Sequence, residues 1–73
     1  MATSHANMDK LVRMANQIAA YFQSYPHDEA VEGVSEHLRK FWEPRMLNAM
    51  KAHVAEGGKD LHILVPEAVR RLA

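Results

Sequence analysis

The stretch DEAVEGVSEHLRKFW, residues 28–42, has the clearest pattern in the chain and decides the fold class. At 100° of rotation per residue, its charged residues fall on one side of a helix and its apolar residues on the other. The helix is expected to begin near Asp28, a good capping residue, and to end at Trp42, because Glu43 precedes Pro44. The apolar side, which we expect to be buried, consists of Ala30, Val31, Val34, Leu38, Phe41 and Trp42.

A second amphipathic helix is predicted upstream, from about Met8 to Ser24. Asn7 is a plausible N-cap, and the Tyr25-Pro26 step ends the helix because a residue before proline avoids helical dihedrals. The residues before this helix are small and polar. We therefore expect a flexible N-terminal tail over residues 1–7 and a single helical domain over residues 8–73.

The apolar face of this upstream helix is unusually wide. Met14, Tyr21 and Tyr25 form a shoulder beside the core arc and widen the apolar surface to roughly half of the helix, which is more than one neighbouring helix would cover. The core arc itself contains Met8, Leu11, Val12, Ala15, Ile18, Ala19 and Phe22.

Two further helices complete the predicted fold. Pro44 suits the first position of a third helix, and Gly57 suits its C-cap. Residues 60–73 are expected to form a loop and then a short helix opened by Pro66. The chain is therefore predicted to be all-α, a small bundle of three main helices plus a short C-terminal helix.

Length and charge exclude several classes of protein. The 73 residues carry nine Lys and Arg against nine Asp and Glu, so the net charge is zero. The chain therefore lacks the positive electrostatic field that a protein binding nucleic acid or an anionic membrane normally carries. No apolar run approaches the roughly 20 residues of a membrane span, so we expect a soluble, cytoplasmic protein. So short a chain without cysteines is expected to be marginally stable on its own, which makes a partner protein a candidate stabiliser.

The sequence shows no pattern of a metal, cofactor or catalytic site. The histidines are never three or four residues apart, and no cysteine completes a ligand set; we expect His37 and His53 to be half-buried and the others, His5, His27 and His62, to be exposed. A phosphate loop, a serine or cysteine nucleophile and a carboxylate pair on an apolar face are likewise missing from the sequence pattern. We therefore predict that the chain is not an enzyme by itself.

Two surface features suggest a protein partner instead. One side of the first predicted helix carries Arg13, Asn16, Gln17 and Ala20 as a stripe that a partner could contact. An ordinary solvent-exposed helix face would show the same pattern. The segment FWEPRM, residues 41–46, combines an aromatic pair with an arginine, and Trp and Arg are enriched at binding hot spots. Its two aromatic residues could equally fill the space between helices or contact a partner. Arg45 lies near the positive end of its helix dipole, where a carboxylate from a partner would stabilise its charge.

Two motifs also resemble a known family. LVRMANQIA, residues 11–19, and FWxPRM, residues 41–46, together with His37, His53 and Gly57-Gly58, are similar to the delta subunit of NAD-dependent formate dehydrogenase. The resemblance covers residues 9–73.

The resemblance implies an accessory subunit of a cytoplasmic molybdenum or tungsten formate dehydrogenase. Its implied partner is the catalytic alpha subunit, within a complex that also has beta and gamma subunits, and its implied role is to support the stability, assembly or cofactor maturation of that subunit. The molybdopterin guanine dinucleotide, iron–sulfur clusters, FMN and NAD of such a complex would lie on other subunits, with none bound by this chain. The expected interface residues are Arg13, Asn16, Gln17, Ala20, Trp42, Pro44 and Arg45.

Two other functions fit three short helices. A helix-turn-helix DNA binder would use residues 45–56 for recognition, but Arg45 and Lys51 are their only cations of the Lys or Arg type. A self-associating helical dimer is the other alternative, and its melting temperature would depend on concentration.

Overall fold

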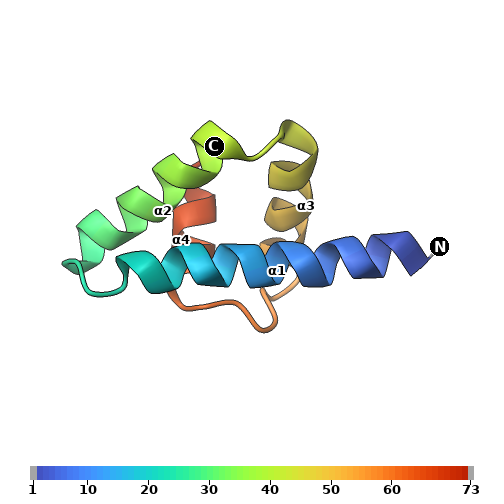
Figure 1. The fold of residues 1–73 in the computed structure, drawn as a ribbon, viewed down its shortest axis with the longest axis horizontal. Helices are drawn as coiled ribbons and strands as arrows, with labels where there is room; N and C mark the ends of the chain where they lie inside the picture. Colours follow the sequence, from blue (N-terminus) through green and yellow to red (C-terminus); the bar gives the residue numbers. More distant parts are fainter. Residues whose placement is uncertain (1, 73) are drawn as a thin grey trace.

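The computed structural model describes the backbone of residues 2–72 and the side chains from Met8 to Leu72. Four helices follow one another, and no strand occurs within the described residues: α1 spans Ala2–Phe22, α2 His27–Phe41, α3 Pro44–Ala55 and α4 Leu64–Arg70. In Figure 1, α1 runs along one edge, α2 and α3 lie beyond it, and α4 lies behind the space between α2 and α3. The predicted all-α fold, with three main helices and a short fourth, is confirmed.

The first two helices differ from their predicted limits. The bounds of α1 begin at Ala2 rather than near Met8, and the expected tail over residues 1–7, with Asn7 and His5, lies outside the residues whose side chains are described. At its other end α1 stops at Phe22, because the Tyr25 N–H donates to the Phe22 carbonyl at 3.0 Å and turns the chain.

The start of α2 also corrects the prediction. Its N-cap is Pro26, with no side-chain cap, so Asp28 is not the cap. Asp28 instead lies in the first turn of α2. There its carboxylate interacts favourably with the positive end of the helix dipole.

The third helix begins at Pro44 as the sequence predicts, but its C-cap is Glu56 rather than Gly57, which is the next residue. Pro44 occupies its first turn, and the chain leaves α3 through a Schellman motif. The Gly58 N–H donates to the His53 carbonyl at 2.9 Å, and the Gly57 N–H donates to the Val54 carbonyl at 3.1 Å. Gly57 has a φ of 120°, which explains glycine at this position. The fourth helix begins at Leu64, two residues before the predicted start at Pro66.

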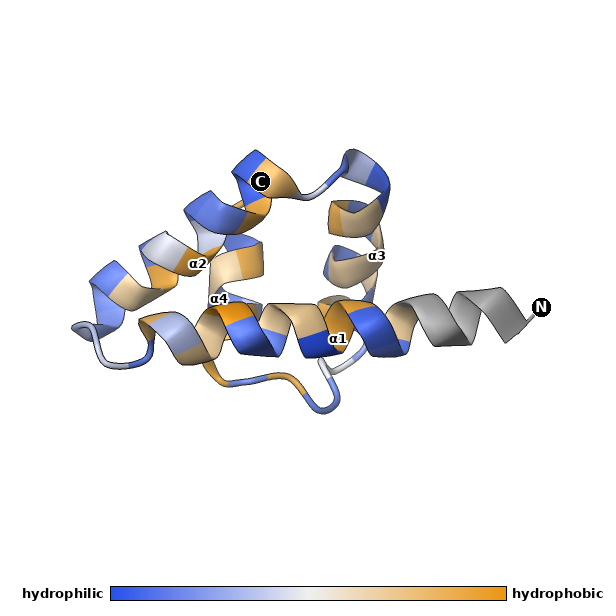
Figure 2. Cartoon of the chain, viewed as in Figure 1, coloured by the Kyte–Doolittle hydropathy of each residue, from blue (hydrophilic) through white to orange (hydrophobic). Residues whose placement is uncertain are grey.

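The core forms where α4 packs against the other three helices, most extensively against α2. Leu38, Met50 and Val65 are fully buried and come from α2, α3 and α4. Along α2, hydrophilic residues lie on the outer edge and hydrophobic residues on the side toward α4 (Figure 2). The other buried apolar residues are Leu11, Ala15, Ala19, Ala30, Val31, Val34, Trp42, Leu64, Ala68 and Val69.

A glycine in the middle of α2 allows an aromatic ring to lie against the helix backbone. A Cβ atom at Gly33 would lie 2.5 Å from Cε1 and 2.6 Å from Cδ1 of Phe22. The Phe22 ring in turn packs edge-on against Tyr21, with 4.9 Å between ring centroids. Gly33 therefore marks the close contact between α1 and α2.

The two aromatic residues at the end of α2 have different environments. Trp42 is 6% exposed and belongs to the core, whereas Phe41 is 70% exposed. The prediction that Phe41 lies on the buried side of this helix is therefore wrong. Trp42 is the first residue after α2 and has an extended backbone. Its side chain therefore leaves the helical direction and joins the core between the helices, a place that the sequence also allowed for Phe41.

Candidate functional site

One residue of the predicted interface stripe has an internal structural role. The Asn16 side chain donates from Nδ2 to the Asp60 carbonyl at 2.9 Å and accepts at Oδ1 from the His62 N–H at 2.7 Å. Asp60 has a φ of 68°, a left-handed conformation that aspartate tolerates better than most residues. The Asn16 amide therefore attaches the loop between α3 and α4 to α1.

Histidine contacts reinforce the same loop. His53 Nε2 lies 2.8 Å from the Lys59 carbonyl, and His62 Nε2 lies 3.2 Å from Gln23 Oε1. His37 and His53 are partly buried, as predicted, and His27 is exposed. His62 is partly buried rather than exposed, because the loop that carries it is fixed to α1.

The main surface feature is an apolar groove of about 710 Å³ between α1, α2 and the start of α3. Residues of α1 form one wall, and residues at the carboxyl end of α2 form the other, with Met46 of α3 at the end. Tyr21 and Phe41 stand on opposite walls, and each is 70% exposed. The lining residues are Met14, Gln17, Ile18, Tyr21, Phe22, His37, Phe41, Trp42 and Met46.

This groove has the composition of a protein-binding surface. Exposed aromatic side chains and methionines supply apolar area that can adapt to a partner. Gln17 and His37 add hydrogen-bonding groups among the apolar side chains. An exposed apolar patch that is not covered by the chain's own residues commonly marks an interaction site.

The structure separates the predicted interface residues into three groups. Gln17 and Trp42 line the groove, although Trp42 presents little of its surface there. Pro44 and Arg45 are exposed in the first turn of α3, immediately before Met46.

The remaining predicted residues lie on or beside the outer side of α1. Arg13 and Ala20 are exposed, and Arg13 lines a shallow polar hollow with Asp60 and His53 rather than the groove. Asn16 makes the internal contacts described above. The interface set stays a prediction.

Sequence reasoning missed the residues that dominate the groove. Tyr21 was assigned to a helix shoulder and Phe41 to a buried helix side, and Met46 was named as part of the segment of residues 41–46. A signal was present, because the apolar face of the first helix was wider than one neighbouring helix would cover. In the structure Met14 and Tyr21 of that shoulder line the groove.

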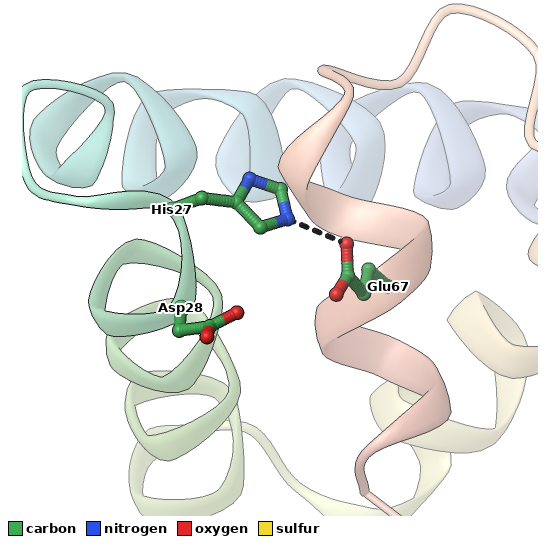
Figure 3. A group of neighbouring side chains, drawn as sticks. All are labelled: His27, Asp28 and Glu67. Atoms are coloured by element: carbon green, nitrogen blue, oxygen red, sulfur yellow. Dashed lines mark hydrogen bonds and ion pairs between the residues drawn. The ribbon is translucent and has the colours of Figure 1, made fainter.

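The fold also brings together one group of residues with metal-ligand chemistry. His27 and Asp28 at the start of α2 face Glu67 of α4, and one ligand atom from each lies within 4.8 Å of the others (Figure 3). His27 Nε2 already contacts a Glu67 oxygen at 2.9 Å. The Arg71 guanidinium lies 3.8 Å from Asp28 and 3.5 Å from Glu67. Arg71 therefore supplies positive charge to the same carboxylates, and the group is best described as an exposed ion-pair network.

None of the helices within residues 2–72 combines the length and the apolar character needed to cross a bilayer. The described residues form a small four-helix domain with an open apolar groove bordered by α1, α2 and α3. The family described as NADH-dependent formate dehydrogenase delta subunit FdsD matches residues 10–69, and the chain belongs to this family. A search of curated proteins and a search of solved structures each gave no match.

Membership of this family makes the chain a subunit of a formate dehydrogenase complex. The match covers both sequence motifs, residues 11–19 and 41–46, and extends through α3 into α4. The predicted family is therefore confirmed.

Proposed function

We propose that the chain is a non-catalytic subunit that docks on the catalytic alpha subunit of its formate dehydrogenase. In this role it supports the stability, assembly or cofactor maturation of that subunit, within a cytoplasmic complex that also contains beta and gamma subunits. The observation that carries the proposal is the family match over residues 10–69. The open groove and its exposed aromatic side chains support it, since they supply an apolar surface for a protein partner.

The chemistry of the chain also supports an accessory role. The 73 residues contain no cysteine, so they offer no thiolate ligand to an iron–sulfur cluster. The groove is lined mainly by apolar and aromatic side chains, which do not form the cradle of backbone N–H groups that a nucleotide phosphate requires. We therefore propose that the molybdopterin guanine dinucleotide, iron–sulfur clusters, FMN and NAD are held by the other subunits.

The proposal is tested by mild affinity purification of the tagged chain from its native cells. Intact-mass analysis identifies the proteins that elute, and formate-dependent NAD reduction measures the activity of the eluate. An active alpha subunit in the eluate supports a resident subunit. An inactive, cofactor-poor alpha subunit supports a role in maturation.

Elution of the chain alone, or with nucleic acid, would contradict the proposal. A second test deletes the chain and measures both the amount and the cofactor content of the alpha subunit. Unchanged abundance, cofactor loading and activity would exclude a role in stability, assembly or maturation.

A further inference from the structure

We propose that the groove between α1, α2 and α3 receives an amphipathic helix of the catalytic subunit, with an apolar row flanked by carboxylates. This inference rests on the proposed function, because it takes the catalytic subunit as the partner. It adds the surface of this chain that makes the contact and the chemistry of the segment that the surface recognises.

The shape of the groove favours a helix as its occupant. On one wall Met14, Ile18 and Tyr21 follow the spacing i, i+4 and i+7 along α1. On the other wall His37 and Phe41 are four residues apart along α2. Two such rows of side chains form ridges, and a third helix packs its own ridge into the furrow between them. The described residues contain no strand edge that could pair with an extended peptide instead.

The polar groups inside the groove are few. Gln17 and His37 can exchange hydrogen bonds with polar side chains at the edge of the bound helix. Apart from the Tyr21 hydroxyl and the Trp42 indole N–H, the rest of the lining is apolar, so we expect the central row of the partner helix to be apolar as well. Anchors at spacings of three and four residues are the usual pattern for this mode of recognition.

The charge around the groove favours carboxylates on its occupant. The nearby cations outnumber the nearby anions, which are Glu36 and Glu43. Glu36 is already paired with Arg39 and with Lys40. The cations within about one helical turn of a lining residue along the chain are Lys10, Arg13, Arg39, Lys40 and Arg45. Arg39 and Lys40 share Glu36, and Arg13 lines the hollow with Asp60, so Lys10 and Arg45 are the cations left for an occupant of the groove.

Arg45 gives the clearest indication of charge complementarity. It is exposed, and it makes no ion pair with any side chain that the structure describes. It lies in the first turn of α3, close to the positive end of the helix dipole. A carboxylate of the bound helix would relieve this repulsion and fix the orientation of the helix in the groove.

The first experiment measures binding of purified variants to the formate dehydrogenase complex prepared without this chain. We expect Phe41→Ala and Tyr21→Ala each to raise Kd about tenfold or more. Ile63→Ala is the matched control, because Ile63 is 80% exposed and lies outside the groove. It is expected to change Kd by less than about twofold. All three residues are exposed, and circular dichroism checks that the helix content is unchanged.

The second experiment tests the charge of the partner. Arg45→Glu is expected to raise Kd about tenfold or more, and Lys51→Glu, the same change on a distant side of α3, by less than about threefold. Glutamate in the first turn of α3 is favourable for the helix, so weaker binding by Arg45→Glu cannot come from unfolding.

The third experiment identifies the bound segment directly. A benzophenone amino acid replaces Phe41, and mass spectrometry identifies the peptide to which it crosslinks in the complex. We expect a peptide of the catalytic subunit with apolar residues at helical spacing and flanking Asp or Glu. Crosslinks to another subunit, or to a basic or non-helical segment, would overturn the inference.

The outcomes separate this inference from the proposed function. If the unaltered chain does not bind the catalytic subunit, the proposed function fails and the inference fails with it. If the unaltered chain binds, but Phe41→Ala, Tyr21→Ala and Ile63→Ala bind equally well, the groove is not the contact surface and only the inference fails.

Discussion

Replacement of Asn16 by alanine is expected to lower the free energy of unfolding by about 1–2 kcal/mol. The side chain makes two hydrogen bonds to the loop between α3 and α4, at 2.9 Å to Asp60 and 2.7 Å to His62. Each such bond contributes roughly 0.5–1.5 kcal/mol, so their loss costs about 1–3 kcal/mol. Alanine is the better helix former, which offsets this loss by roughly 0.6 kcal/mol.

The assay is thermal and urea denaturation of the purified chain, followed by circular dichroism at the helix band. For a domain of this size each kcal/mol corresponds to about 4–8 °C, so Tm is expected to fall by about 5–15 °C. Gln17→Ala is the matched control, since Gln17 is the next residue, is exposed, and makes no hydrogen bond within the described side chains. It is expected to change stability by less than about 0.5 kcal/mol.

A specific result would refute this reasoning. If the two variants differ by less than about 0.5 kcal/mol, the amide of Asn16 does not hold the loop. Asn16 would then be available as the interface residue that the sequence pattern predicted. If Asn16→Ala is destabilised and also binds the complex more weakly, binding must be compared at a temperature where both variants are folded.

Four further substitutions test the packing of α2 and of the residue that follows it. Trp42→Ala is expected to lower the free energy of unfolding by about 3–5 kcal/mol, whereas Phe41→Ala should change it by less than about 0.5 kcal/mol. Similar urea midpoints for the two variants would contradict the different burial of the two side chains. Gly33→Ala is expected to lower the free energy of unfolding by about 1 kcal/mol, because moving the Phe22 ring away from the new Cβ costs more than the gain in helix propensity. A higher Tm would contradict the close contact. Ser35→Ala is expected to raise stability by about 0.5–1 kcal/mol in urea titration, because the buried Ser35 hydroxyl has no hydrogen-bond partner in the described structure, and a loss would reveal one.

Much of the fold could be predicted because its signals are local. Helical periodicity together with Pro26, Pro44 and Gly57 places the limits of three helices within about two residues, except the start of α1. Periodicity gives the direction of a side chain from its own helix, but it does not give the position of the neighbouring helices. Phe41 and Trp42 lie on the same predicted side, and the path of the chain into α3 determines that only Trp42 is covered.

The candidate site was harder to predict because its contacts join distant parts of the chain. The stripe containing Asn16 has the composition of a solvent-exposed face, and nothing near Asn16 in the sequence indicates a loop more than 40 residues away. The groove depends on how far α1, α2 and α3 stand apart, which no single helix determines. The wide apolar face of α1 indicated only that some of this surface would lack a partner within the chain.

The position of α4 in the core also determines when the domain can fold during synthesis. Leu64, Val65, Ala68 and Val69 complete the core around α2, yet they follow all the other buried core residues in the chain. At about 5–20 residues per second, the first three helices exist for seconds before the segment that covers their inner faces is synthesised. The amide of Asn16 likewise waits for Asp60 and His62. Folding of this domain therefore waits for α4, and a partner that met the nascent chain before α4 was synthesised would find its core side still open.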